Sequence, residues 1–264
     1  MSINFLKNTE LPYFELKTCS HGFECRKHIH NEFSLGIVEH GHSNFWANGN
    51  VNTIGPGNVI IIPSQIVHSC MPKRQDNWKY KMLFINEAWF ATIIKKNNGL
   101  KRLAKAAGFI DRSLYYRVES LLSCLFEAGN PLEQETRVIA LLDQLAQNEP
   151  SICNETSRYP THGLKKVKEY ICDNFKDKIL LDDLVNISGF SKFHLVRFFQ
   201  QIYFLPPHAL QTVLRINYAK QDLKKGRRIV DVAVETGFAD QSHFTRTFKK
   251  YVGITPEAYQ ISSK

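Results

Sequence analysis

The spacing of hydrophobic residues changes along the chain and divides it into parts. Between residues 13 and about 86, short alternating apolar and polar runs are separated by turn residues, which predicts a small all-β unit. Between 87 and 148, leucines and valines recur every three or four residues on both sides of Gly129-Asn130-Pro131, which predicts an antiparallel pair of amphipathic helices. Beyond 161 the spacing is again helical. The pattern therefore predicts an α+β chain of more than one domain.

A polar stretch without periodicity, interrupted by prolines, separates the helical pair from the last part of the chain. Such a composition is typical of a linker. We place the first domain at 1–148, with its all-β part at about 10–86 and its helices at about 87–148, the linker at 149–160, and the second domain at 161–264.

The second domain contains one pattern twice. Matching residues lie 48 or 49 positions apart: Gly189 and Gly237, Phe190 and Phe238, His194 and His243, Arg197 and Arg246, Phe199 and Phe248, Pro207 and Pro256. Each copy has a short amphipathic helix, a Gly-Phe turn in which glycine can adopt a positive φ, a capping Ser or Asp, and a second helix. The copies predict helix-turn-helix units at about 181–202 and 229–251.

The second helix of each unit has a basic and polar face. Lys and Arg can contact phosphates, whereas Gln, Ser and Arg can bond to base edges in a major groove. A merely solvated surface is the alternative for one such face, but the duplication disfavours it. We predict DNA contacts by Lys192, His194, Arg197 and Gln200 in the first unit, and by Gln241, Ser242, Thr245, Arg246, Lys249 and Lys250 in the second.

The stretch from Gly237 to Tyr259 (GFADQSHFTRTFKKYVGITPEAY) resembles the signature of the AraC/XylS family of bacterial transcription regulators almost throughout, and the resemblance covers about 161–262. It implies seven helices, with a helix over Pro207–Lys225 joining the two units, and recognition helices that reach successive major grooves. By position, it adds Phe193 and Val196 to the DNA contacts. It also implies a homodimer, and it favours an activator that acts with RNA polymerase.

The two copies differ where their second helices end. Copy two has Gly253 at this point, whereas copy one has Phe204. A side chain with a Cβ disfavours the left-handed conformation that commonly ends a helix. We therefore expect the first unit to end its second helix in a different way.

Histidines of the N-terminal domain follow a recognisable spacing. His28-x-His30 followed by Gly57-x5-Pro63-x4-His68 resembles the two conserved boxes of the cupin barrel, a sensor fold commonly attached to regulators of this family. The resemblance covers roughly 10–86. We expect one strand over His28–Val38, which places His28, His30 and Glu32 on the same face as His40.

Three interpretations of this cluster remain open. The histidines bind an organic effector, or they hold a divalent transition metal, or they merely satisfy one another or lie at the surface. For a metal, His28, His30 and His68 would be the ligands, with Glu32 as a fourth, although the glutamate of metal-binding cupins lies further along the chain. The predicted effector-binding residues are His28, His30, Glu32, His40, Trp46, His68, Tyr80 and Met82.

The net charge of +9 is unevenly distributed. Residues 161–264 contain 17 Lys and Arg against 10 Asp and Glu, whereas residues 1–160 contain 17 against 15. The excess of basic residues lies with the duplication, as phosphate binding requires. Six scattered cysteines indicate reduced thiols rather than a disulfide framework. Neither a signal peptide nor a membrane span is recognisable, so we expect a cytoplasmic, nucleoid-associated protein without a membrane partner.

These features predict a one-component transcription regulator and not an enzyme. Its partners would be double-stranded promoter DNA, a small effector in the barrel, and a second copy of the chain. The competing hypothesis is a metal-dependent cupin enzyme, or a metal-sensing regulator, that uses His28, His30 and His68. Activation is favoured over repression by family resemblance alone.

Overall fold

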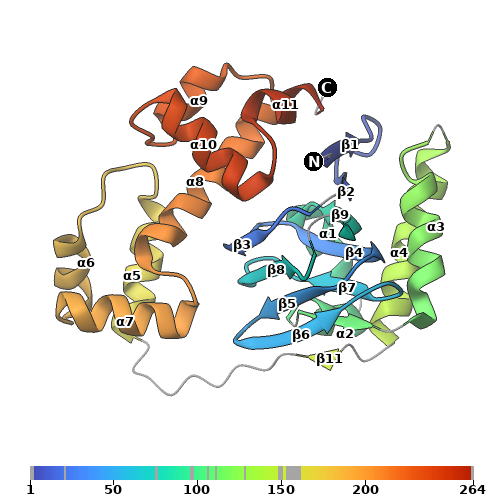
Figure 1. The fold of residues 1–264 in the computed structure, drawn as a ribbon, viewed down its shortest axis with the longest axis horizontal. Coiled ribbons are helices and arrows are strands. Elements are labelled where there is room, and N and C mark those ends of the chain that lie inside the picture. Colours follow the sequence, from blue (N-terminus) through green and yellow to red (C-terminus); the bar gives the residue numbers. More distant parts are fainter. Residues whose placement is uncertain are drawn as a thin grey trace. The chain divides into compact units, whose positions relative to one another are not determined.

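The computed structural model describes residues 3–20, 22–74, 77–95, 98–105, 107–110, 112–127, 129–147, 151–152 and 162–262. The chain forms two compact units, one from the N-terminal 154 residues and one from Glu155–Ile261. The first combines strands and helices, and the second is helical (Figure 1). Most of the linker that we predicted at 149–160 lies outside the described residues.

The first unit contains two antiparallel sheets. The larger has the strand order β1-β2-β9-β4-β7-β10-β11, and the smaller has the order β3-β8-β5-β6. The strands are β1 (Ile3–Lys7), β2 (Phe14–Ser20), β3 (Cys25–His28), β4 (Phe33–His40), β5 (Ser43–Ala47), β6 (Asn50–Ile54), β7 (Val59–Ile62), β8 (His68–Pro72), β9 (Lys79–Ile85), β10 (Gly108–Ile110) and β11 (Ser151–Ile152). The larger sheet therefore extends beyond the range of about 10–86 that the sequence predicted.

The single strand predicted over His28–Val38 is wrong. Strand β3 ends at His28 and pairs with β8 in the smaller sheet, whereas β4 begins at Phe33 and pairs with β7 and β9 in the larger one. Asn31 and Glu32 form a bend between them. Gln65 stabilises this connection, because its backbone N–H donates to the carbonyl of His30 and its amide donates to Asn31 at 2.7 Å. The chain thus passes from one sheet to the other at the predicted cluster.

The hairpin between β5 and β6 agrees with its sequence signal. Asn48 and Gly49 both have a positive φ, 47° and 87°, which matches the two-residue turn whose twist suits paired strands. The strand Val59–Ile62 is buried along its whole length, also as predicted.

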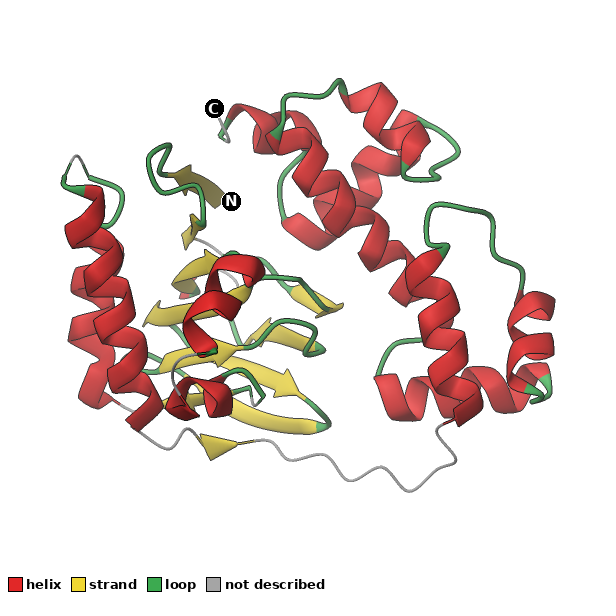
Figure 2. Ribbon diagram, turned by 180° about the vertical axis from the view of Figure 1, so that it is seen from behind, coloured by secondary structure: helices red, strands yellow, loops and turns green. Residues whose placement is uncertain are grey.

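Helices cover one face of the larger sheet (Figure 2). They are α1 (Glu87–Ile94), α2 (Asn98–Leu103), α3 (Tyr115–Cys124) and α4 (Pro131–Gln147), of which α3 and α4 correspond to the predicted pair. Leu35, Ile37 and Leu83 belong to the core that these helices share with the sheet. Because side chains alternate along a strand, Ser34, Gly36 and Met82 face the other way, toward the smaller sheet.

The second unit contains seven helices within residues 162–262, as the resemblance implied. They are α5 (His162–Asp173), α6 (Leu181–Ser188), α7 (Lys192–Tyr203), α8 (Pro207–Lys224), α9 (Ile229–Glu235), α10 (Gln241–Val252) and α11 (Pro256–Ile261). Over the parts of the chain that the structure describes, no helix combines the length and the apolar character needed to cross a membrane.

The end of α7 corrects one expectation. Phe204 has φ 58°, so it adopts the same left-handed conformation as Gly253, which has φ 100° after α10. The first helix-turn-helix unit therefore ends its second helix in the same way as the second helix-turn-helix unit. The cost for a non-glycine residue is about 1–2 kcal/mol. The burial of Leu205 and the immediate start of α8 at Pro207 require a tight reversal here, and they outweigh that cost.

Candidate functional site

Both helix-turn-helix units use the same local devices. Gly189 and Gly237 follow α6 and α9 with φ 72° and 76°, the left-handed conformation in which glycine carries no steric penalty. The side chain of Ser191 accepts a hydrogen bond from the backbone N–H of His194 and thereby caps α7, and Asp240 caps α10 in the same way through His243. Sequence and structure therefore agree on where each recognition helix begins.

The two recognition helices bury aromatic faces and expose polar ones. Phe199 and Phe248, at equivalent positions, are fully buried. The predicted DNA contacts lie on the opposite faces. Exposed are Lys192, Phe193, His194, Arg197, Gln200, Gln241, Ser242, Arg246, Lys249 and Lys250, and half-buried are Val196 and Thr245. The structure thus brings each set together on one face of α7 or α10.

The exposed faces of α7 and α10 are not chemically equal. Phe193 is 68% exposed, whereas the matching position on α10 is Ser242. Phe193 and Val196 line an open hollow on α7 together with Lys192, Arg197, Gln200 and Gln201. Gln201 was not predicted, although it directly follows Gln200 on the same helix. Lys192 pairs with Asp182 of α6 at 2.6 Å, so part of its charge is already compensated.

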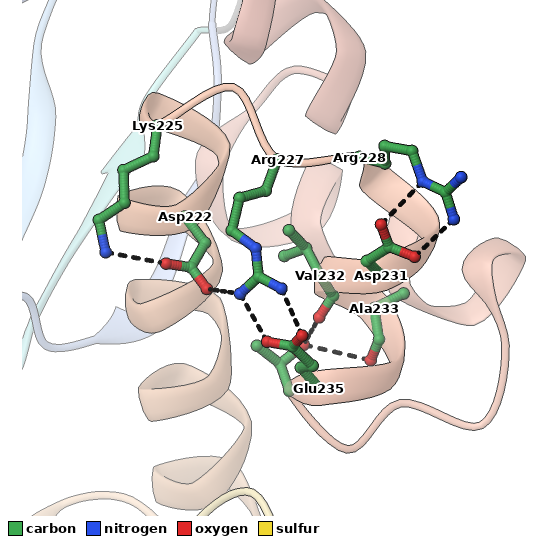
Figure 3. A network of polar contacts seen from close by, with 9 residues as sticks. Asp222, Lys225, Arg227, Arg228, Asp231, Val232, Ala233 and Glu235 are labelled. Carbon is green, nitrogen blue, oxygen red and sulfur yellow. Dashed lines mark hydrogen bonds and ion pairs between the residues drawn. The ribbon is translucent and has the colours of Figure 1, made fainter.

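A network of charges fixes the connection between α8 and α9 (Figure 3). The buried carboxylate of Asp222 accepts hydrogen bonds from Lys225 at 3.0 Å and from Arg227 at 2.8 Å. Arg227 also pairs with Glu235 of α9. Burial alone would raise the pKa of the Asp222 carboxyl, but the hydrogen bonds and charges of Lys225 and Arg227 hold it below its usual value. Asp222 is therefore ionised and stabilises the start of the second helix-turn-helix unit.

Three histidines gather between the two sheets of the first unit. His28 at the end of β3 lies opposite His68 at the start of β8, and His30 comes from the bend that follows β3. Their ring centroids are 4.2–5.8 Å apart, and their possible ligand atoms all lie within 4.8 Å of one another. His30 and His68 are buried. The predicted convergence of these histidines is thus present, although not on one strand.

Backbone carbonyls orient all three imidazoles. Nδ1 of His28 lies 2.7 Å from the carbonyl oxygen of Arg26, and Nδ1 of His30 lies 2.8 Å from that of Glu32. Nδ1 of His68 lies 2.9 Å from the carbonyl oxygen of Ile66. When Nδ1 donates to these oxygens, Nε2 carries the lone pair. Burial, together with His28, lowers the pKa of His68 well below its ordinary value, so this ring is neutral. The donor set therefore fits a divalent transition metal, and it equally fits an organic ligand that donates hydrogen bonds.

Three other predicted residues lie apart from this cluster. Glu32 contributes its backbone carbonyl to His30, and its carboxylate is not among the grouped ligand atoms. His40 is exposed at the end of β4. Trp46 lies on the face of β5 opposite the buried Phe45, with the Lys27 ammonium 3.7 Å from its ring centroid. The break between β3 and β4 explains the separation of His40, because the expected shared face does not exist.

Tyr80 and Met82 of β9 are buried, as predicted. Sequence reasoning missed two ionisable neighbours on β2, Glu15 and Lys17, which are only 3% and 6% exposed. The Lys17 ammonium lies 4.9 Å from the ring of Phe23 and 5.8 Å from that of Tyr80. The alternation along β2 could have indicated them. Phe14 and Leu16 belong to the core under the helices, so Glu15 and Lys17 face the opposite side of the sheet. The space between the sheets therefore combines aromatic, imidazole and charged groups.

Two family models match the chain. Residues 14–146 match the AraC-like ligand binding domain, and residues 184–261 match a helix-turn-helix domain. The first match runs from β2 into the last turn of α4 and so leaves out the edge strands β1 and β11, and the second runs from within α6 to the end of α11.

Individual proteins are similar to most of the chain or to part of it. The uncharacterized HTH-type transcriptional regulator YbfI of Bacillus subtilis is 27% identical over 219 residues, which cover 82% of this chain and 80% of that protein. The HTH-type transcriptional activator AarP of Providencia stuartii is 28% identical over 113 residues, covering 42% of this chain and 84% of that protein. The crystal structure of ToxT from Vibrio cholerae has the same fold, with a TM-score of 0.59, 13% identity, and coverage of 96% and 98%.

Proposed function

Since this chain belongs to the AraC family of transcription regulators, we propose that α7 and α10 bind successive major-groove segments of promoter DNA and that an effector held between the two sheets controls this binding. The observation that carries the proposal is the equivalence of Arg197 and Arg246. Both are exposed at matching positions on helices that are capped and buried in the same way. A single basic helix would be an ordinary surface, whereas two matched ones suit a duplex.

The contacts divide by chemistry. Arg197, Arg246, Gln241 and Ser242 are suited to base edges, because their donors and acceptors match the pattern of the major groove. Lys249 and Lys250 are suited to phosphates, which supply affinity that depends on salt but not on sequence.

The test is binding of the purified chain to duplex DNA from the region flanking its own gene, at two salt concentrations. Wild type is compared with an Arg197→Ala/Arg246→Ala double variant. We expect tight, sequence-selective binding that the double variant loses. Weak binding by the wild type that depends on salt and is indifferent to sequence, with and without candidate effectors, would count against the proposal.

The effector site of this proposal is formed by His28, His30 and His68, with Tyr80 and Met82 on the facing strand. An effector changes DNA occupancy only if it binds differently to the DNA-competent and incompetent states. A His68→Ala variant should lose the effector response and keep basal DNA binding. His40→Ala is the matched control, because His40 is exposed and lies apart from the cluster.

A second candidate is a metal-responsive regulator, favoured by the three oriented imidazoles. His28, His30 and His68 would hold the ion, which would supply a positive charge that fixes β3, β8 and the bend relative to one another. Metal analysis of the purified protein, followed by DNA binding with and without a chelator, tests this. Enzymatic use of such a metal is less well supported, because burial raises the pKa of Tyr80 further above neutral pH, so that its hydroxyl stays protonated and does not act as a base.

The proposal also includes a homodimer formed through α3 and α4. Along this helical pair Tyr116 is 76% exposed, Ile139 37% and Leu132 72%, and a second copy of the pair would cover these apolar side chains. Sedimentation of the wild type and of a Tyr116→Arg/Leu132→Arg variant tests it. Activation through RNA polymerase is proposed on family grounds, and transcription in vitro from a bound promoter is its test.

A further inference from the structure

Helix α8 joins the two helix-turn-helix units, and Arg215 lies near its middle. The guanidinium donates to four backbone carbonyl oxygens: Phe175 at 2.7 Å, Lys176 at 3.4 Å, Asp177 at 2.8 Å and Gly237 at 2.5 Å. Phe175–Asp177 lie in the loop from α5 to α6, which leads into the first unit. Gly237 is the turn residue of the second unit. One side chain therefore connects both units.

Further contacts hold the same loop to α8. Gln211, one helical turn before Arg215, donates its amide to the carbonyl oxygens of Phe175 at 3.1 Å and Asp177 at 2.8 Å. The Lys176 ammonium lies 3.7 Å from the ring centroid of Tyr218 on α8. The loop is thus held on both sides of Arg215. Its carbonyls also follow the C-terminal end of α5, where a cation is favoured.

The turn of the second unit lies directly against this loop. A Cβ atom at Gly237 would lie 2.1 Å from the carbonyl oxygen of Lys176 and 2.7 Å from Nη2 of Arg215. The corresponding position in the first unit, Gly189, has no neighbouring atom within 4 Å of such a Cβ. The two turns therefore share a backbone geometry but not an environment, and only the second is part of the contact with Arg215.

We propose that Arg215 is a positioning residue that fixes the placement of α10 relative to α7, and thereby sets the spacing between the two DNA segments that the chain accepts. This inference rests on the proposed function. A continuous α8 alone would leave two units joined by one helix. The hydrogen bonds from Arg215 add a second connection, and hydrogen bonds from a charged donor are stronger than those between neutral groups.

The experiment measures tolerance of spacing. A duplex is first selected with the wild-type full chain from a random-sequence pool, and one base pair is then inserted between its two contacted segments. The insertion rotates one segment by about 34° and moves it by about 3.4 Å. The readout is the ratio of the Kd for the inserted duplex to the Kd for the selected duplex.

We expect a ratio of about tenfold or more for the wild type, the scale of losing one base contact. For Arg215→Ala we expect a ratio below about threefold, together with weaker binding to the selected duplex. A role in folding alone would reduce the active fraction, which scales both Kd values equally and leaves the ratio unchanged. The matched control is Arg228→Ala, because Arg228 pairs with Asp231 inside the second unit, and its ratio should equal that of the wild type.

A wild-type ratio in Arg215→Ala overturns the inference. If that variant fails to fold, Arg215→Gln is measured instead, since one amide group replaces the separate guanidinium donors to Gly237 and to the loop, and an unchanged ratio there has the same meaning. A selection that yields no preferred sequence contradicts the proposed function itself. Selective binding with an unaltered ratio contradicts only the role of Arg215.

Discussion

The carboxylate of Asp222 lies 2.8 Å from the guanidinium of Arg227, which also pairs with Glu235 (Figure 3). The Asp222 side chain is 3% exposed and that of Arg227 is 35% exposed. A buried carboxylate is thus compensated by a cation that still reaches solvent. These side-chain contacts connect the end of α8 to α9, in addition to the backbone that joins the two helices.

Replacing Asp222 by Asn should lower the free energy of unfolding at pH 7 by about 1–3 kcal/mol, because the charged hydrogen bonds to Arg227 and Lys225 are lost. The pKa of Asp222 is lowered from 3.8 in the folded chain. Its contribution is therefore present above pH 3.8 and disappears as the carboxyl becomes protonated at lower pH. Urea unfolding at pH 7 and pH 3 measures this. A difference between wild type and variant that does not shrink at pH 3 would contradict it.

The two turn glycines should respond unequally to alanine. Gly189→Ala introduces only the left-handed penalty of about 1–2 kcal/mol, since its Cβ meets no atom within 4 Å. Gly237→Ala adds a clash with the backbone of Lys176, so it should cost at least about 3 kcal/mol. Thermal or urea unfolding of both variants gives the comparison, and equal losses would show that the loop moves freely away.

Two phenylalanines of α7 provide a matched pair. Phe193 is 68% exposed and Phe199 is fully buried. Phe193→Ala should leave stability within about 0.5 kcal/mol while weakening specific DNA binding, whereas Phe199→Ala should destabilise the fold by about 3–5 kcal/mol. Chemical unfolding and DNA titration of both variants separate the two roles. A destabilised Phe193→Ala would indicate a packing role instead.

Arginine and lysine on α10 should differ in their dependence on DNA sequence and salt. Arg246→Ala should cost about 1–3 kcal/mol on the specific site and much less on random DNA. Lys249→Ala should weaken both by similar factors and reduce the slope of log K against log salt by about 1. Equal losses of binding free energy on specific and random DNA for Arg246→Ala would show that Arg246 contacts a phosphate rather than a base.

The helical unit was predictable because its signals are local. The turn glycines, the capping residues Ser191 and Asp240, and the apolar spacing of each helix lie within a few residues of what they determine. Phe204 was the exception. Its left-handed conformation is imposed by the short reversal into α8, and a residue's own preference cannot report such a constraint.

The site between the sheets was predictable in composition but not in geometry. The spacing of His28, His30 and His68 indicated their convergence, and the structure confirms it. Alternation along one strand then placed His40 in the same group, because a bend at Asn31 and Glu32 leaves no strong sequence signal. Lys17 and Glu15 were missed because ionisable residues on a strand are usually solvated, and their burial depends on the distant β9.

Strand β11 is short and lies at the edge of the larger sheet, next to β10, which in turn pairs with β7. Strand β7 pairs with β4, whose Ser34 lies 3.4 Å from Nε2 of His30. The last strand before the predicted linker is therefore connected by backbone pairing, through β10 and β7, to the strand that contacts the histidine cluster.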